Sequence, residues 1–188
     1  MMLRILLALA LALLFPAAAS ANCANEVCAS IQKIFDARSG NFAKLKGAPG
    51  HAPKGDPFWQ GTLTISGLLD YCRVFARGEG SRYFSRYEYR CDSSELGTAA
   101  TLPLAEAKVL ADRIKSAIQS ADLKLVWFDD PDAGALAKIE GFEGSQAWYG
   151  GSAPNKLEVK VAVFGSAAGG STVTATVFAK PLARRDVK

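Results

Sequence analysis

The feature that most constrains this chain is its set of four cysteines, at positions 23, 28, 72 and 91. In an exported chain an even number of cysteines indicates disulfides, here two. A zinc site of four cysteines would need two closely spaced pairs of ligands. Only Cys23 and Cys28 are close together, whereas eighteen residues separate Cys72 from Cys91. We therefore expect two disulfides and no metal site.

The first 21 residues have the layout of a secretory signal peptide. Arg4 supplies a positive charge, residues 5–15 form an apolar run, and residues 19–21 form a small-residue cleavage site. The run is shorter than the roughly 20 apolar residues that a membrane-spanning helix needs. We therefore expect removal of residues 1–21, no membrane span in the mature chain, and a periplasmic or secreted location.

The remaining chain has the length of a single domain. Residues 22–180 are expected to form that domain, and residues 181–188 a flexible basic tail. Loss of Arg4 lowers the net charge from +4 to +3. Because this charge is small, we expect no nucleic acid as a partner. The sequence indicates no oligomeric state.

Apolar residues recur every three or four positions on residues 24–38 and again on residues 102–121, which predicts two helices. Residues 47–57 are rich in glycine and proline and are expected to form an irregular surface loop. Alternation with a period of two predicts strands at 58–66, 68–77, 82–91, 123–130 and 144–152, and a hairpin of 156–165 with 171–180.

This order of elements predicts the fold class. Strands that follow one another directly favour an antiparallel sheet over alternating strand–helix units. We expect an α+β fold of two layers, in which the antiparallel sheet carries two main helices on one face and disulfides stabilise the domain. No internal repeat is visible in the sequence.

Residues 71–91 contain five arginines and six aromatic residues. Alternation places Cys72 and Cys91 on an apolar face and the arginines on the reverse face. A tight turn would oppose Cys72 to Tyr87 and leave the two cysteines about 13 Å apart, which is too far for a disulfide. A longer loop opposes Cys72 to Cys91 and favours that bridge together with Cys23–Cys28. A bridge from Cys28 to a strand cysteine is the open alternative.

The arginine-rich face of this segment is the candidate binding surface. Guanidinium groups form paired hydrogen bonds with carboxylates and phosphates, and they stack on aromatic rings. The expected partner is therefore an acidic protein or an anionic envelope component. A solvated strand face, on which arginine stems cover aromatic rings, is the alternative interpretation. The binding candidates are Arg73, Arg77, Arg82, Phe84, Arg86 and Arg90.

The sequence predicts no catalytic residue, metal ligand or cofactor. Ser30 and Lys33 have the S-x-x-K spacing of serine acyl-enzymes, but the accompanying motifs are missing. The leading hypothesis is an exported, non-enzymatic bacterial protein that binds another macromolecule, as an inhibitor, an immunity protein or an envelope interaction protein. The alternatives are a carrier of a small apolar ligand between sheet and helices, and a carboxylate-based cell-wall hydrolase.

Overall fold

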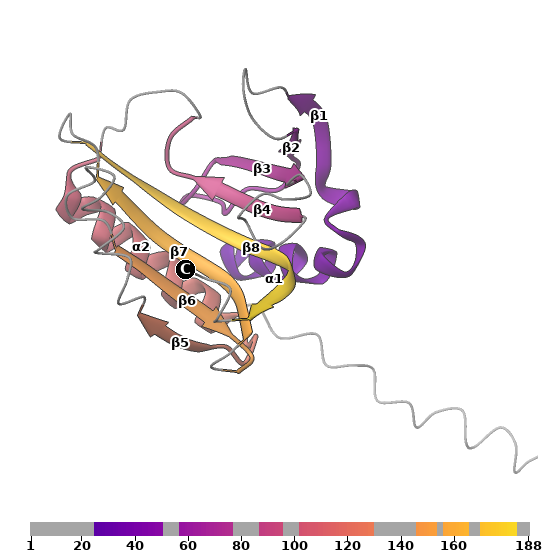
Figure 1. Ribbon diagram of the computed structural model, residues 1–188. Helices are drawn as coiled ribbons and strands as arrows, with labels where there is room; N and C mark the ends of the chain where they lie inside the picture. The colour runs from indigo at the N-terminus through magenta and orange to yellow at the C-terminus, as the bar shows by residue number, and fades with distance from the viewer. Residues whose placement is uncertain are drawn as a thin grey trace, which may run out of the picture.

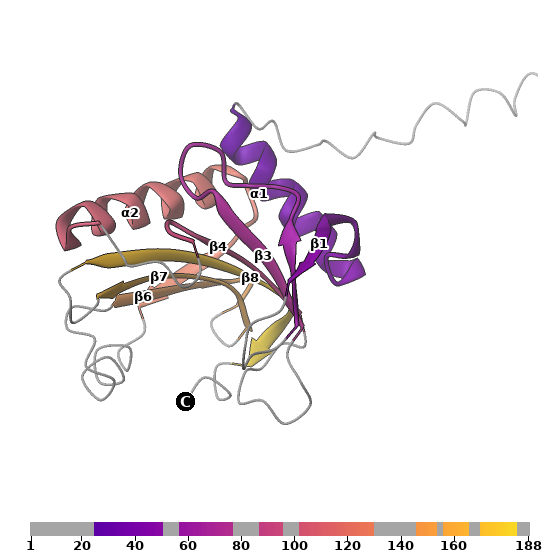
Figure 2. The same cartoon turned by 90° about the horizontal axis from the view of Figure 1, so that it is seen from above.

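The computed structural model describes residues 25–50, 57–76, 87–95, 102–129, 146–153, 156–165 and 170–183. These residues form one antiparallel sheet of eight strands with two α-helices on one of its faces (Figures 1 and 2). The predicted α+β class, antiparallel sheet and disulfide stabilisation are confirmed. No helix in this part of the chain combines the length and the apolar character needed to cross a bilayer.

The elements follow one another along the chain, with η marking short 3-10 helices. They are α1 (Glu26–Asp36), η1 (Ala37–Gly40), η2 (Ala43–Leu45), β1 (Lys46–Gly50), β2 (Phe58–Gly61), β3 (Tyr71–Ala76), β4 (Tyr87–Asp92), α2 (Leu104–Ser120), β5 (Val126–Asp129), β6 (Gln146–Gly151), β7 (Lys156–Gly165) and β8 (Ser171–Ala183). Across the sheet the strand order is β1-β2-β3-β4-β8-β7-β6-β5.

This strand order divides the described domain into two halves of the same topology. In each half an α-helix precedes a meander of four strands, and the two meanders join where β4 pairs with β8. Counted outward from this join, β4 corresponds to β8, β3 to β7, β2 to β6 and β1 to β5. The likeness is one of topology, because the sequence shows no matching repeat.

Both predicted helices form, and each buries one stripe of side chains. The side chain of Asn25 accepts a hydrogen bond of 2.9 Å from the backbone N–H of Cys28, which caps the N-terminus of α1. The buried stripe of α1 consists of Cys28, Ile31, Ile34 and Phe35. That of α2 consists of Ala107, Ala111, Ile114 and Ile118. These stripes cover the valine-rich inner face of the sheet and form the main core.

The predicted strand 58–66 is too long. Strand β2 ends at Gly61, because the Tyr89 side chain takes up the backbone of Leu63. The Tyr89 hydroxyl donates a hydrogen bond of 2.6 Å to the carbonyl of Leu63 and accepts one of 3.1 Å from its N–H. A side chain at Gly61 would collide with the same hydroxyl.

The sheet also includes residues that were not predicted as strand. The irregular loop predicted at 47–57 begins with an ordered strand, since Lys46–Gly50 forms β1 and pairs with β2. Pro49 is tolerated there because β1 is at the edge of the described sheet, where no N–H is required on the outer side. At the other end of the chain, β8 extends to Ala183, three residues beyond the predicted end of the domain at 180.

Candidate functional site

The pairing of β3 with β4 assigns their side chains to two faces. Cys72 opposes Cys91, and Arg73 opposes Arg90. The predicted longer register is therefore confirmed, and the tight-turn register that opposed Cys72 to Tyr87 is wrong. Both cysteines are buried on the face that the helices cover, and the two arginines belong to the opposite face, which we call the open face.

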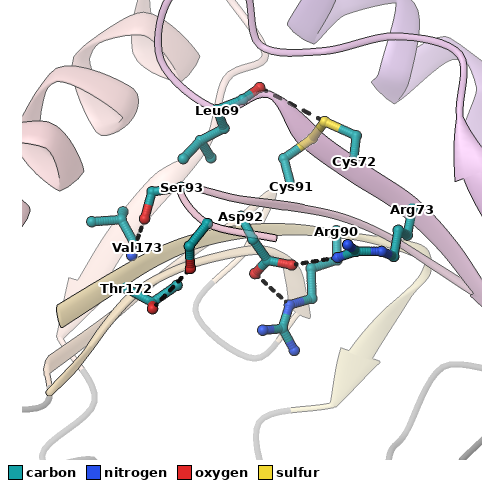
Figure 3. A network of polar contacts seen from close by, with 10 residues as sticks. Leu69, Cys72, Arg73, Arg90, Cys91, Asp92, Ser93, Thr172 and Val173 are labelled. Carbon is teal, nitrogen blue, oxygen red and sulfur yellow. Dashed lines mark hydrogen bonds and ion pairs between the residues drawn. A yellow bond between two sulfur atoms is a disulfide. The ribbon is translucent and has the colours of Figure 1, made fainter. Parts of the chain in front are cut away.

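The predicted bridge between Cys72 and Cys91 is present, and the two Cα atoms lie 4.0 Å apart. It links the two strands on the core side, whereas the arginines lie on the other side (Figure 3). Cys28 is also disulfide-bonded. Its expected partner, Cys23, lies outside the described residues. The alternative bridge from Cys28 to a strand cysteine is wrong, because Cys72 and Cys91 bind each other.

Arg73 was predicted to be a binding residue on an accessible strand face, but its side chain is buried. Only 3% of the residue is exposed. Its guanidinium group lies 5.7 Å from the ring centroid of Phe58, and Nη1 lies 3.4 Å from Oδ2 of Asp92. This side chain therefore contacts strand β2 through Phe58 and strand β4 through Asp92. Arg73 is therefore a buried partner of the site and not a surface contact.

Arg90 occupies the more exposed side of the same carboxylate. Its Nε donates a hydrogen bond of 2.7 Å to Oδ1 of Asp92, and 31% of its side chain is exposed. Figure 3 shows the Asp92 carboxylate between the two guanidinium groups. We call Arg73, Asp92 and Arg90 the arginine–aspartate network. It holds one arginine at the surface through a carboxylate that is itself buried.

The electrostatic environment of Asp92 reflects this burial. Loss of solvent around the carboxyl group raises its pKa, and the charge and hydrogen bond of Arg90 and the charge of Arg73 act in the opposite direction. Because the pKa of Asp92 is raised and not lowered, desolvation has a larger effect on this carboxyl group than the two arginines have. Charges in the network are therefore poorly screened by water and interact more strongly than charges on an exposed strand face.

Four of the predicted binding residues, Arg77, Arg82, Phe84 and Arg86, lie outside the described residues. The sequence interpretation also missed one site residue, Asp92. Alternation would have found it, because Asp92 follows Arg90 by two positions and shares its face. The predicted strand ended at Cys91, one residue before the carboxylate that contacts both arginines.

The core between helices and sheet gives little room for a small ligand. The hollow lined by Ile31, Phe35, Tyr89 and Val177 has a volume of about 10 Å³, which is about the minimum space for one water molecule. Trp59 and Trp148 are covered by the chain's own lysines, since Nζ of Lys46 lies 3.9 Å and Nζ of Lys115 lies 4.4 Å from the respective ring centroids. This geometry does not favour the apolar-carrier alternative.

Among the described residues, no group of histidine, cysteine, aspartate and glutamate side chains is arranged to hold a metal ion. We compared the chain with known protein families, with curated proteins and with solved structures, and none of them matches it. Any functional assignment must therefore be argued from the arginine–aspartate network and its surroundings.

Proposed function

We propose that this protein is an exported, non-enzymatic binding protein that engages an acidic macromolecule. The binding element is the pair of strands β3 and β4 together with residues 77–86, which connect them in the sequence. The observation that carries the proposal is the arginine–aspartate network, in which buried Asp92 holds the part-exposed side chain of Arg90. An arginine that is already held loses little conformational entropy when a partner binds.

Two further features support this proposal. The Cys72–Cys91 disulfide lies one residue from the network on each strand, so it limits how far the two arginine-bearing strands can separate. Residues 77–86 add three arginines and one glutamate, Glu79, to the network. Residues 73–92 therefore hold five arginines against three acidic residues, which gives this short segment a net charge of +2. Such a local charge speeds association with an acidic partner and disfavours basic ones.

The test is affinity capture from an envelope extract with the oxidised mature protein as bait. The test variant is Arg82→Glu/Arg86→Glu. The matched control is Lys108→Glu/Arg113→Glu, which reverses the same number of charges at exposed positions of α2, on the helix-covered side of the sheet (Figure 2). Circular dichroism and thermal unfolding establish that each bait is folded.

We expect a stoichiometric acidic protein to be captured by the wild type and by the control, and to be lost with the test variant. Capture that the test variant retains in full would contradict the proposal. Recovery of no protein, or of a lipid or cell-wall polymer in place of a protein, would contradict it as well.

A further inference from the structure

The part-exposed arginine of the network has unused hydrogen-bonding capacity. Arg90 binds Asp92 through Nε, and within the described part of the chain its two terminal nitrogens have no partner. These two nitrogens form the end of a planar fork, which matches the two oxygens of a carboxylate. The side chain is 31% exposed, and Figure 3 shows its terminal nitrogens pointing away from Asp92.

The buried arginine of the network is also incompletely satisfied. Nε of Arg73 is buried and has no hydrogen-bond partner, although the residue is only 3% exposed. A buried donor without an acceptor is unfavourable and calls for an explanation. Of the described residues, only Asp92 forms an ion pair with Arg73 or Arg90. Two positive charges therefore face one negative charge, which leaves an excess of one positive charge.

The neighbouring strands extend this positive region across the open face. Arg90 opposes Thr176 on β8, and Thr176 opposes Lys160 on β7. At the usual spacing of strands, Arg90 and Lys160 are about 10 Å apart at their Cα atoms, one on each side of Thr176. The ammonium group of Lys160 lies over aromatic rings, with Nζ 5.6 Å from the ring centroid of Tyr149 and 5.5 Å from that of Phe164, so it adds positive charge to the open face without being placed at the end of Arg90.

Glu88 is the other acidic residue that β4 places on this face. It opposes Phe75 on β3 and Phe178 on β8, one step along the strand from the arginines. It forms no ion pair with Arg73 or Arg90. The excess positive charge of the network is therefore not cancelled by Glu88 through direct contact.

We infer that the terminal nitrogens of Arg90, backed by Arg73 and fixed by Asp92, form an oxyanion site whose ligand is a side-chain carboxylate from an acidic segment of the partner protein. This inference rests on the proposed function. A carboxylate is favoured over a phosphate dianion, because it carries the single negative charge that balances the network and presents two oxygens in one plane.

The experiment is a titration of the oxidised full chain at low ionic strength, followed by NMR of ¹⁵N-labelled arginine side chains. The probes are a short oligoglutamate peptide and, separately, inorganic phosphate. The variants are Arg90→Gln, which removes the charge, and Arg90→Lys, which keeps a charge beside Asp92 but removes the planar fork. Arg113→Gln and Arg113→Lys on α2 are the matched controls.

We expect the peptide to shift the Arg90 side-chain signals at lower concentration than phosphate does. Its affinity should fall about tenfold in Arg90→Gln and several-fold in Arg90→Lys, as loss of a charge-assisted contact implies. The Arg113 variants should bind like the wild type. Unchanged affinity in both Arg90 variants, or stronger binding of phosphate than of peptide at Arg90, would overturn the inference.

The two proposals fail separately. If capture of a protein depends on Arg82 and Arg86 while the Arg90 variants bind the peptide normally, the carboxylate site is wrong and the proposed function stands. If the peptide binds at Arg90 but no protein is captured, the site stands as a carboxylate site and the proposed function is wrong.

Discussion

At the scale of single residues, Tyr89 determines where a strand ends. Its hydroxyl occupies both backbone groups of Leu63, so these groups are not free to continue the ladder of β2. The residue is 1% exposed, and burial raises its pKa to about 12, against the smaller opposite effect of the hydrogen bond with Leu63. A single side chain thus packs in the core and also forms hydrogen bonds with the backbone that follows β2.

We predict that Tyr89→Phe lowers the free energy of unfolding by about 1 to 3 kcal/mol, because the N–H of Leu63 is left without a partner in a part-buried position. Chemical denaturation measures this change. Tyr71→Phe is the control, since Tyr71 is 41% exposed and its variant should differ from the wild type by less than about 0.5 kcal/mol. Equal stability of the two variants would contradict the role of Tyr89.

The same tyrosine predicts a dependence on alkaline pH. Its pKa in the folded protein is about 12, and that of an unfolded tyrosine is about 10. Its contribution to stability is therefore complete below about pH 10 and is lost as pH rises toward about 12. The wild type should lose about 1 kcal/mol more than Tyr89→Phe between about pH 9 and about pH 11. A parallel decline of both proteins would contradict this account.

Asp92 is the second residue whose environment makes a prediction. Because burial raises its pKa, the ionised form is less favourable in the folded than in the unfolded protein. Its contribution to stability is thus complete below the unfolded pKa of about 3.9 and is lost as pH rises through the folded pKa. An aspartate whose pKa is lowered by its ion pairs would show the opposite behaviour, since its contribution to stability would be lost as pH falls.

We therefore predict that the unfolding free energy of the wild type falls relative to that of Asp92→Asn as pH rises from about 4 to 7. Asparagine does not titrate, so the unfolding free energy of this variant should depend less on pH over the same range. Urea titrations across this pH range provide the measurement. A wild type that gains stability relative to the variant between about pH 4 and about pH 7 would show that the ion pairs outweigh burial.

At the scale of elements, the β3–β4 pair is linked by a disulfide on the core side and by charge on the open side. The cysteines and the arginines occupy successive positions in the same register, Cys72 with Cys91 and Arg73 with Arg90. The covalent link and the arginine–aspartate network therefore restrict the same two strands from opposite faces.

We predict that Cys72→Ala/Cys91→Ala lowers the free energy of unfolding by about 3 kcal/mol, the effect expected for a disulfide that closes a loop of this length. The sequence separation of the two cysteines is 19. Val74→Ala, on the same buried face, is the control for lost packing. A reductant should lower the unfolding free energy of Val74→Ala more than that of the double variant, because only Val74→Ala still contains the Cys72–Cys91 disulfide. A double variant within about 1 kcal/mol of the wild type would contradict this role.

Elements with a regular apolar pattern were predictable from the sequence alone. The helices α1 and α2 and the strands β6, β7 and β8 fall within or close to their expected ranges, because their burial follows a local period. The early end of β2 depends on Tyr89, which lies far along the chain and whose contact leaves no local pattern. The strand β1 was missed because its pairing with β2 overrides a composition typical of loops.

The site was predictable to the same extent. Alternation correctly separated the cysteines from Arg73 and Arg90, since it depends only on the strand period. The burial of Arg73 could not be read from it, because the side chain contacts Phe58 on β2 and Asp92 on β4, which the fold brings next to it. The face of a side chain follows from local sequence, but its exposure depends on residues brought next to it by the fold.

At the scale of the whole molecule, the two halves share one core. Buried residues of both meanders and both helices belong to a single cluster, and β4 pairs with β8 along five residue positions. Neither half has a separate hydrophobic core on the helix side. The described domain should therefore unfold as a unit, in spite of the repeated topology.

We predict that tryptophan fluorescence reports the same unfolding midpoint from either half. Trp59 lies on β2 of the first half, whereas Trp127 and Trp148 lie on β5 and β6 of the second. Trp127→Phe/Trp148→Phe therefore reports on the first half and Trp59→Phe on the second. In each variant, the fluorescence midpoint should match the midpoint from circular dichroism. A difference between the two probes in one protein would mean that the halves unfold separately.

The most direct test of the proposed binding role is photo-crosslinking in cells that export the protein. A photoreactive phenylalanine derivative replaces Phe84 in the arginine-rich segment and, in the control, Val109, which is 62% exposed on α2. We predict a defined adduct with one acidic protein from position 84 and none from position 109. An adduct from position 109 alone, or none from either position, would contradict the assignment of this segment as the binding element.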